Sequence, residues 1–390
     1  MNYKAAVLKN KLELFLIWPI VFFGKIAGYL FPLKSKNSTF LFFSSADIGG
    51  SIKVNADILN CIKHKKPVII FSKKPKNNQF LHFFEIEGIT ILDLSKYIDN
   101  KWLHFLNLFF RGLISTWINN ANTPIVFGGE CIYFYKMVPY LKKSTKTLEL
   151  CHLNTWFNFS QAYIRFIDYR IFSTKKIKRD VEAQYLVNAV PVKYNTQLHF
   201  IDNKIIIPPL KIIENDGLKI LYVGRGAPQK RVHLIAAIAK NLEQNSQKFH
   251  FTFVGDVDTI IDVNLHINCT LLGNINNEKK LHQLYAAADV LILTSAYEGL
   301  PLVVMEMMAR GKVVLSTAVD SIPDYITHLQ NGLLLFEQGE LEIVDEAVSL
   351  LQLLESDKLL LKALGEKSYQ FAIKNFSEAN FNQFYKNLFL

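Results

Sequence analysis

Short apolar runs alternate with longer stretches of helical periodicity along most of the chain. The runs of the first half are rich in Phe, Ile, Val and Leu and lack strict alternation. This pattern is typical of strands buried on both faces of a parallel sheet. Helical stretches such as 52–63 and 101–119 separate the runs, which predicts βαβ units. The predicted strands of this half are 39–44, 67–71, 89–92, 124–127, 147–151 and 170–173.

The second half repeats this rhythm after a proline-containing linker at about 190–216. We expect Asn276 or Asn277 to cap one helix, and Pro301 and Gly311 to bracket another. Two Rossmann-like, doubly wound α/β domains in series account for both halves. The predicted elements here are strands 218–223, 249–254, 268–272, 289–294 and 312–316, helices 230–243, 278–288 and 301–310, and further helices within 340–390.

An apolar stretch at 14–33 precedes the first predicted strand. Its length approaches the ~20 residues of a membrane-spanning helix, but we expect Pro19 and Gly24 to interrupt it, and Lys25 lies inside it. Basic residues on both flanks give no orientation bias. We favour an amphipathic helix lying on an anionic membrane surface; a helix packed on the protein's own core and a true span are the alternatives. The flanking lysines are Lys4, Lys9, Lys11, Lys34 and Lys36.

Composition and charge sharpen this picture. Half of the 390 residues are hydrophobic, which excludes a disordered chain. The net charge of +10 is uneven: residues 1–200 carry +15 and residues 201–390 carry −5. Such a split suggests that the first half has an anionic partner. The four cysteines form no CxxC pair, which argues against a disulfide framework or a zinc site and favours a reducing cytoplasm.

Candidate chemistry concentrates in residues 294–311, TSAYEGLPLVVMEMMARG. Here a predicted strand ends, a loop carries Glu298, and a helix carrying Glu306 begins. Ligands of open α/β sheets bind at this carboxyl edge, and free amides at a helix start attract phosphate. The two carboxylates would repel phosphate but can accept hydrogen bonds from hydroxyls, so a sugar and a ribose are plausible ligands.

A second loop, residues 223–231 (VGRGAPQKR), follows another strand of the same predicted sheet. Its glycines allow close approach of the backbone, and Arg225 and Lys230 supply positive charge. Together the two loops could stabilise a diphosphate whose negative charge grows as the bond to it breaks.

These residues carry a family resemblance. Glu298 and Glu306 stand in the E-x7-E spacing of the retaining GT-B glycosyltransferases of family 4, also called group 1. The block EGLPLVVMEMMARGKVVLST, the loop GRGAPQKR, the segment LLGNINNEKKLHQLYAAADVLILTS and the strand NGLLL resemble family motifs in the family's order over about 220–336. The resemblance implies a GT-B fold, in which two Rossmann-like domains face a central cleft.

The resemblance also implies roles. Arg225 and Lys230 would bind the donor diphosphate, Glu306 the ribose hydroxyls, and Glu298 the transferred sugar, as a catalytic contact. The chain departs from the family at Met307, which replaces Ala, and at Asp320–Asp324 (DSIPD), which replaces G-G-x-x-E and leaves sugar contacts there in doubt. The amides of Gly299, Leu300 and Leu302 would meet the β-phosphate and the backbone near Gly273 the base.

The first half supplies fewer candidates. Gly49 and Gly50 match the family's glycine-rich first loop and would let the backbone approach the donor, unless they form only a tight turn. His152 follows a predicted strand where the family often places a catalytic histidine, and we predict that Glu130 reaches the acceptor. A buried structural histidine is the alternative for His152. Asp256-Val257-Asp258 resembles a D-x-D metal motif, but we interpret it as a solvated turn and expect no metal.

We therefore predict a cytoplasmic retaining glycosyltransferase, peripheral on the inner face of the cytoplasmic membrane. It would use a nucleotide-diphosphate sugar as co-substrate, without another cofactor, and a glycan or lipid-linked acceptor of envelope polysaccharide or lipopolysaccharide synthesis. A transferase for a soluble metabolite and a non-catalytic GT-B scaffold are the alternatives, and we expect no nucleic-acid partner. The predicted parts are a membrane-associating segment 1–36, an acceptor domain 37–205, a donor domain 206–375, and a final helix 376–390 packed on the acceptor domain.

Overall fold

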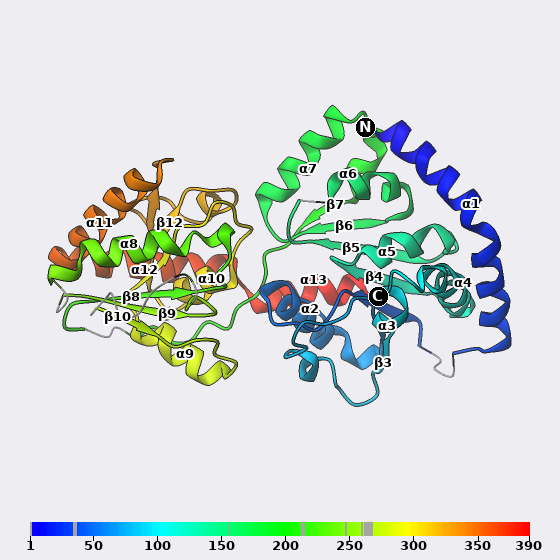
Figure 1. Ribbon diagram of the computed structural model, residues 1–390, viewed down its shortest axis with the longest axis horizontal. Coiled ribbons are helices and arrows are strands. Elements are labelled where there is room, and N and C mark those ends of the chain that lie inside the picture. The colour runs from blue at the N-terminus through cyan, green and yellow to red at the C-terminus, as the bar shows by residue number, and fades with distance from the viewer. Residues whose placement is uncertain are drawn as a thin grey trace. The chain divides into compact units, whose positions relative to one another are not determined.

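The protein consists of two compact units, each built on one parallel sheet (Figure 1). The first unit comprises Met1–Ile201 and Ala379–Leu390, and the second comprises Asp202–Glu378. The predicted class, two doubly wound α/β units, is therefore confirmed. The computed structural model describes residues 2–33, 37–154, 156–211, 215–245, 248–258, 260 and 268–390.

The sheet of the first unit has seven parallel strands in the order β3-β2-β1-β4-β5-β6-β7. All five residues of β1 are buried, which explains why this strand is a continuous apolar run in the sequence. One strand, β7, was missed, because it has three residues and lies within the predicted linker. The strands are β1 (Thr39–Phe43), β2 (Val68–Phe71), β3 (Thr90–Asp93), β4 (Ile125–Gly129), β5 (Lys146–Cys151), β6 (Tyr169–Phe172) and β7 (Leu198–Phe200).

The last helix of the chain belongs to this first unit. The rings of Phe389 and Phe127 lie 5.8 Å apart between centroids, and Cys61 Sγ lies 3.1 Å from Asn382 Oδ1. Residues 379–390 therefore belong to the first unit, although they follow the second unit in the sequence. The helices of the unit are α1 (Tyr3–Leu30), α2 (Gly50–Ile62), α3 (Ser95–Ile98), α4 (His104–Asn120), α5 (Ile132–Met137), α6 (Phe157–Ser160), α7 (Lys175–Val187) and α13 (Glu378–Leu388).

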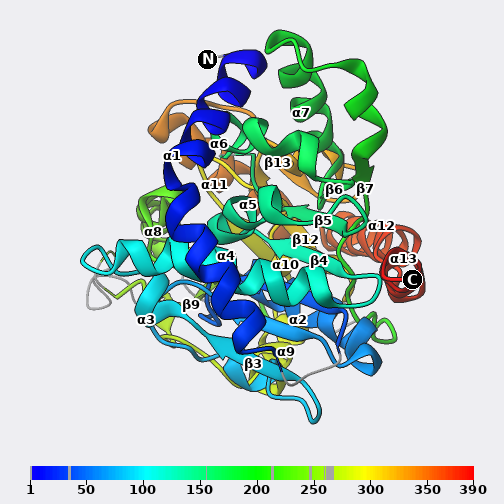
Figure 2. The ribbon, with the colours of Figure 1, turned by 90° about the vertical axis from the view of Figure 1, so that its right-hand side faces the viewer.

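Helix α1 is continuous, so the expected interruption at Pro19 and Gly24 is wrong. Pro19 is exposed and lies inside the helix, which continues past it although proline lacks the N–H of a helical hydrogen bond. Position 24 has no room for a side chain, because α1 packs closely against α4 (Figure 2). A Cβ on Gly24 would lie 2.0 Å from Phe109 O, and one on Gly112 would lie 2.0 Å from Val21 O.

We call Gly24, Gly28 and Gly112 the glycine seam. A Cβ on Gly28 would lie 2.7 Å from Thr116 Cβ, so all three positions of the seam have no room for a side chain. The seam brings the backbones of α1 and α4 together as small residues do between packed membrane helices. The flanking Lys34 and Lys36 lie outside the described residues.

The second unit has six parallel strands in the order β10-β9-β8-β11-β12-β13. As predicted, Asn277 caps α9 by accepting from Lys280 N at 3.0 Å. Pro301 is the N-cap residue of α10 rather than its first residue, and Gly311 follows the helix with φ +67°. The elements are β8 (Leu218–Val223), α8 (Val232–Asn241), β9 (Phe249–Val254), β10 (Cys269–Leu271), α9 (Glu278–Ala287), β11 (Val290–Leu293), α10 (Leu302–Met308), β12 (Val313–Thr317), β13 (Leu333–Leu335), α11 (Glu340–Ser356) and α12 (Lys358–Asn375).

Candidate active site

The two loops predicted to bind the donor lie side by side at the carboxyl edge of the second sheet. Arg231, in a left-handed conformation with φ +45°, donates from its guanidinium to Thr294 O at 2.7 Å and to Ser295 O at 3.1 Å. The amide of Ala296 donates to Gln229 O at 2.8 Å. The loop after β8 and the loop after β11 are therefore held as one rigid wall.

Lys230 and Glu298 meet across this wall. The Lys230 ammonium forms an ion pair with Glu298 Oε1, which also accepts from Ser295 Oγ at 2.6 Å. Both side chains are largely buried, with 13% of Lys230 and 6% of Glu298 exposed. Asp320 Oδ2 accepts from the amide of Glu298 at 2.8 Å and so fixes the loop that carries it. Asp320 lies in the segment where the chain departs from the family, and its role was not predicted.

Arg225 is exposed, and its guanidinium makes no hydrogen bond or ion pair within the described part of the chain. Its loop is nevertheless well held: Tyr222 Oη donates to Arg225 O at 2.9 Å, and Gly226 N donates to Asp256 Oδ1 at 2.9 Å. A Cβ on Gly226 would lie 2.1 Å from Asp256 O, so the two loops touch. Asp256, the first carboxylate of the D-x-D sequence, thus orders the loop and leaves Arg225 available for an anion.

Glu306 lies on α10 beside two partners that the sequence analysis did not identify. The Arg310 guanidinium forms an ion pair with Glu306 Oε2 and donates to Glu306 O at 2.9 Å. His282 Nε2, on α9, lies 3.7 Å from Glu306 Oε1. The i, i+4 spacing of Glu306 and Arg310 was a usable signal, whereas nothing local pointed to His282.

The remaining donor candidates border the same edge. Gly299 and Leu300 follow Glu298 in the loop, and Leu302 is the first residue of α10. Gly273 follows β10 with φ +61°, and its carbonyl accepts from Gly255 N at 2.9 Å. A Cβ there would meet nothing within 4 Å, so the left-handed φ rather than crowding favours glycine. Their contacts with a donor stay predictions.

In the first unit, Gly49 and Gly50 stand at the start of α2. Gly49 is extended, with φ 166°, and a Cβ on it would meet nothing within 4 Å. Neither backbone strain nor packing therefore requires glycine at position 49. Open space over the helix start is compatible with the predicted approach to a donor, which stays a prediction.

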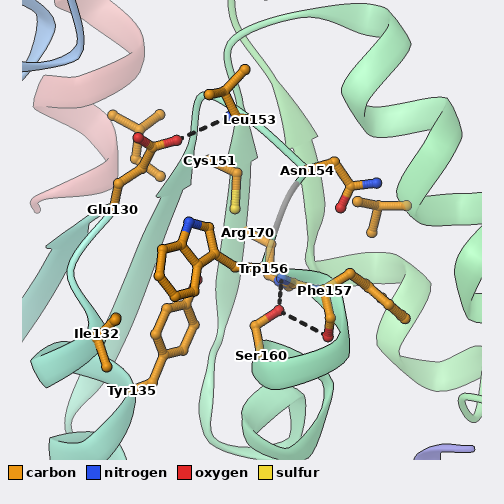
Figure 3. Close-up of a pocket in the computed structure, with 12 residues that line it drawn as sticks. Glu130, Ile132, Tyr135, Cys151, Leu153, Asn154, Trp156, Phe157, Ser160 and Arg170 are labelled. Carbon is orange, nitrogen blue, oxygen red and sulfur yellow. Dashed lines mark hydrogen bonds between the residues drawn. The ribbon is translucent and has the colours of Figure 1, made fainter. Parts of the chain in front are cut away.

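Glu130 and His152 are coupled through the backbone. Glu130 follows β4 with φ +48°, and its Oε1 accepts from His152 N at 2.7 Å and from Leu153 N at 2.9 Å. Figure 3 shows the carboxylate directed at this loop. The Glu130 carbonyl in turn accepts from Ser44 Oγ at 3.0 Å. Glu130 thus holds the loop that carries His152. This positioning role was not predicted, and the predicted contact of Glu130 with the acceptor stays a prediction.

The His152 side chain is partly buried near the Glu130 carboxylate. Its Nε2 is buried and has no hydrogen-bond partner among the described residues. Burial lowers the pKa of His152, and the negative charge of Glu130 partly opposes that effect. Because its pKa is lowered from 6.5, the ring is mainly neutral at pH 7.

A hollow lies next to this loop, between the ends of β4 and β5 (Figure 3). Its floor is a buried network in which the Arg170 guanidinium donates to both carboxylate oxygens of Glu149. Burial alone would raise the pKa of Glu149, but the charge and hydrogen bonds of Arg170 hold it below its usual value. Trp156 and Ile132 are about half exposed at the rim, so the hollow offers apolar surface over a rigid base.

Comparison with known families finds a match to the second unit. Residues 206–371 match the model of the family described as glycosyl transferases group 1. The second unit is therefore similar to that family. The Lys230–Glu298 pair, Arg225 and Glu306 all lie inside the matched region, which covers less than half of the chain.

Individual relatives agree with this assignment. An uncharacterized glycosyltransferase of Methanocaldococcus jannaschii is 32% identical over 133 residues, 33% of this chain and 34% of the relative. N-acetyl-alpha-D-glucosaminyl L-malate synthase of Bacillus anthracis is 27% identical over 176 residues, 44% of each chain. The chain thus matches less than half the length of these relatives.

A solved structure extends the likeness to the whole fold. The crystal structure of Anabaena Alr3699/HepE in complex with UDP-glucose superposes with a TM-score of 0.70, covering 90% of this chain and 98% of that chain at 15% identity. At this identity the likeness shows the fold alone, and it confirms the predicted GT-B class. Both units therefore share the fold of that structure, although the family match covers only the second unit.

Within the described residues, no group of three or more His, Cys, Asp or Glu side chains has the geometry of a metal site. In the second unit Lys230 pairs with Glu298 and Glu306 with Arg310, while Arg225 makes no contact with either pair. The candidate donor-binding residues therefore include two ion pairs and one guanidinium without a partner among the described residues.

Proposed function

We propose that this chain is a retaining glycosyltransferase that moves a sugar from a nucleotide-diphosphate sugar to an acceptor hydroxyl. The observation that carries the proposal is the wall of the second unit, where Lys230 pairs with Glu298 and Arg225 stands exposed beside them. An unpaired guanidinium next to a rigid glycine loop is suited to a diphosphate. The family match of this unit supports the same activity.

The proposed chemistry follows from charge. As the bond between the sugar and the diphosphate breaks, negative charge grows on the leaving phosphate, and Arg225 and Lys230 stabilise it. When Lys230 turns to the phosphate, Glu298 is released to accept a hydrogen bond from the sugar. Glu306 accepts from the ribose hydroxyls. Attack from the same face, assisted by the leaving phosphate, retains the anomeric configuration, and these cations supply the charge that a metal ion would supply.

We propose that the first unit binds the acceptor, with His152 on the loop held by Glu130. The acceptor is proposed to be lipid-linked, of the kind used in envelope polysaccharide or lipopolysaccharide synthesis. The basic first half and the long apolar helix α1 support a cytoplasmic enzyme, peripheral on the inner face of the membrane. Helix α1 is long and apolar enough to cross a membrane by length and composition alone.

A soluble acceptor is the second candidate. One relative is named for the synthesis of N-acetyl-alpha-D-glucosaminyl L-malate, and malate is a small soluble molecule. The two candidates differ in one measurement: transfer to a lipid-linked saccharide compared with transfer to the same saccharide without its lipid. Preference for the free saccharide, or for a small hydroxy acid, would replace the lipid-linked proposal.

The activity is tested by incubating the protein with UDP-, GDP- and ADP-sugars and measuring release of the nucleoside diphosphate. We expect turnover by the wild type and loss of about 100-fold or more in Lys230→Ala and Glu306→Ala. Lys358→Ala, which removes an exposed lysine of the same unit, is the control and should be fully active. EDTA should not change the rate, and the anomeric configuration of the product should match that of the donor. A folded but inactive wild type across the panel would favour a non-catalytic scaffold.

A further inference from the structure

The outer face of α1 presents a continuous row of exposed apolar side chains. We define the outer row as Leu8, Leu12, Phe15, Phe23, Ile26 and Leu30, whose exposed fractions lie between 41% and 79%. At about 100° per residue these six fall on one side of the helix, opposite the buried stripe that contains the glycines of the seam. Figure 2 shows α1 running across the face of the first unit that is turned to the viewer. Such a row marks an interaction surface.

The inner face of α1 is held by polar contacts as well as by the glycine seam. Arg165 donates to Asn10 Oδ1 at 3.0 Å, and Lys136 pairs with Glu13 at 2.6 Å. A helix that crossed a bilayer would break both contacts and expose the amide and the carboxylate to hydrocarbon, which is costly. The helix is therefore a fixed part of the first unit, and only its outer row is free to meet a partner.

The charges around the row identify the partner. Lys4, Lys9 and Lys11 are exposed on the same helix and lie at the two edges of the outer row. The acid of the described helix, Glu13, is already paired with Lys136. A second copy of this face would therefore bring no free carboxylate to the three lysines. An anionic bilayer surface supplies both the hydrocarbon for the row and the phosphates for the lysines.

We propose that α1 docks the first unit on an anionic lipid bilayer, with the helix lying in the plane of the membrane and its outer row inserted among the acyl chains. At 1.5 Å per residue the 28-residue helix offers a contact about 42 Å long. This docking proposal rests on the peripheral membrane location proposed above, and it identifies the residues that would contact the membrane. Because α1 does not bend away from the unit, the first unit is held at a fixed depth and orientation.

The proposal is tested by sedimentation of the full chain with vesicles of phosphatidylcholine, alone or with 30% phosphatidylglycerol. The variant Leu12→Gln/Leu30→Gln/Ile26→Gln removes apolar surface from the outer row. Its control is Leu341→Gln/Leu359→Gln/Ile373→Gln, which replaces the same residue types at exposed positions of the second unit. Glutamine keeps a high helix propensity in both sets. Nucleotide release from the donor, measured without vesicles, reports the proposed function separately.

We expect the control to bind anionic vesicles like the wild type and the outer-row variant to lose at least about tenfold in affinity, with unchanged circular dichroism. Lys4→Gln/Lys9→Gln/Lys11→Gln should lose the preference for phosphatidylglycerol, and salt should weaken wild-type binding.

Equal binding of the outer-row variant and the control would overturn the proposal. Membranes that retain the protein after washing at pH 11 would instead show a span. A dimer in solution that the outer-row variant dissolves, without vesicle binding, would show an interface between copies.

Discussion

The ammonium of Lys230 and the carboxylate of Glu298 form an ion pair, although 68 residues separate them in the sequence. The pair is largely buried, and Ser295 and Asp320 fix the residue that carries the carboxylate. In such surroundings either charge alone is costly, because water cannot compensate for the missing partner. The pair therefore stabilises the fold, and its Lys230 ammonium is also the positive charge that we propose for binding a phosphate.

Removing one partner should separate these two roles. We expect Lys230→Met or Glu298→Gln alone to lower the free energy of unfolding by about 3 kcal/mol, since each leaves an uncompensated buried charge. The double variant should recover most of this loss in urea titrations, whereas its transferase rate should stay at least about 100-fold below that of the wild type. Stability losses that simply add in the double variant would show that the two side chains do not depend on each other.

Glu130 offers a test of positioning against direct contact. Glu130→Ala frees the amides of His152 and Leu153, and we expect kcat to fall by about 100-fold because the loop loses its geometry. Glu130→Gln keeps an acceptor oxygen and should lose far less.

Two readouts distinguish the roles of Glu130. Because the Glu130 charge raises the pKa of His152, Glu130→Gln should lower that pKa further, as histidine NMR would show. A large rise of the acceptor KM in Glu130→Gln with the pKa of His152 unchanged would indicate that the carboxylate contacts the acceptor instead.

Burial of His152 also predicts a pH dependence of stability. In the unfolded chain a histidine titrates near pH 6.5, and burial lowers the pKa of His152 below that value in the folded protein. The stabilisation is therefore complete above about pH 6.5 and is lost as the pH falls toward the folded pKa, because the unfolded chain takes up the proton first. The contribution changes by at most about 1.4 kcal/mol per pH unit.

Urea unfolding of wild type and His152→Gln between pH 5 and 8 isolates this contribution. Other partly buried histidines, such as His199, also have lowered pKa values and act in both proteins, so only the difference between the two curves belongs to His152. Parallel curves for the two proteins would mean that His152 titrates like an exposed residue.

The glycine seam predicts where α1 tolerates no change. Gly24→Ala places a Cβ 2.0 Å from Phe109 O, and we expect it to lower the free energy of unfolding by about 1–3 kcal/mol despite the better helix propensity of alanine. Ala5→Leu adds more volume at an exposed position of the same helix and should change stability by about 0.5 kcal/mol or less. Equal stability of Gly24→Ala and wild type in thermal unfolding would show that α1 moves freely on α4.

The strands were predictable because their local signal and their tertiary environment agree. Apolar residues predominate in 218–223 and 249–254, and these ranges match β8 and β9 residue for residue. The three-residue edge strand β7 lacks such a run and was taken for linker. Pro19 was expected to interrupt α1, because the local rule for proline does not include the packing that keeps the helix continuous.

The candidate residues were found by motif, but their partners were not. Arg310 and Asp320 hold Glu306 and the Glu298 loop, and each partnership depends on side-chain directions that spacing alone does not give. The glycine seam illustrates the same limit: Gly24 looks like a helix breaker in the sequence, and only α4 shows why it is needed.

Helix α13 has a consequence for the order in which the protein assembles on the ribosome. Phe389 is fully buried in the first unit, yet it is synthesised after the whole second unit. The sheet of the first unit therefore emerges early but lacks this part of its core until translation has passed residue 389. A stalled or truncated chain would release a complete second unit joined to an incomplete first unit, so quality control of this protein falls on the unit that is made first.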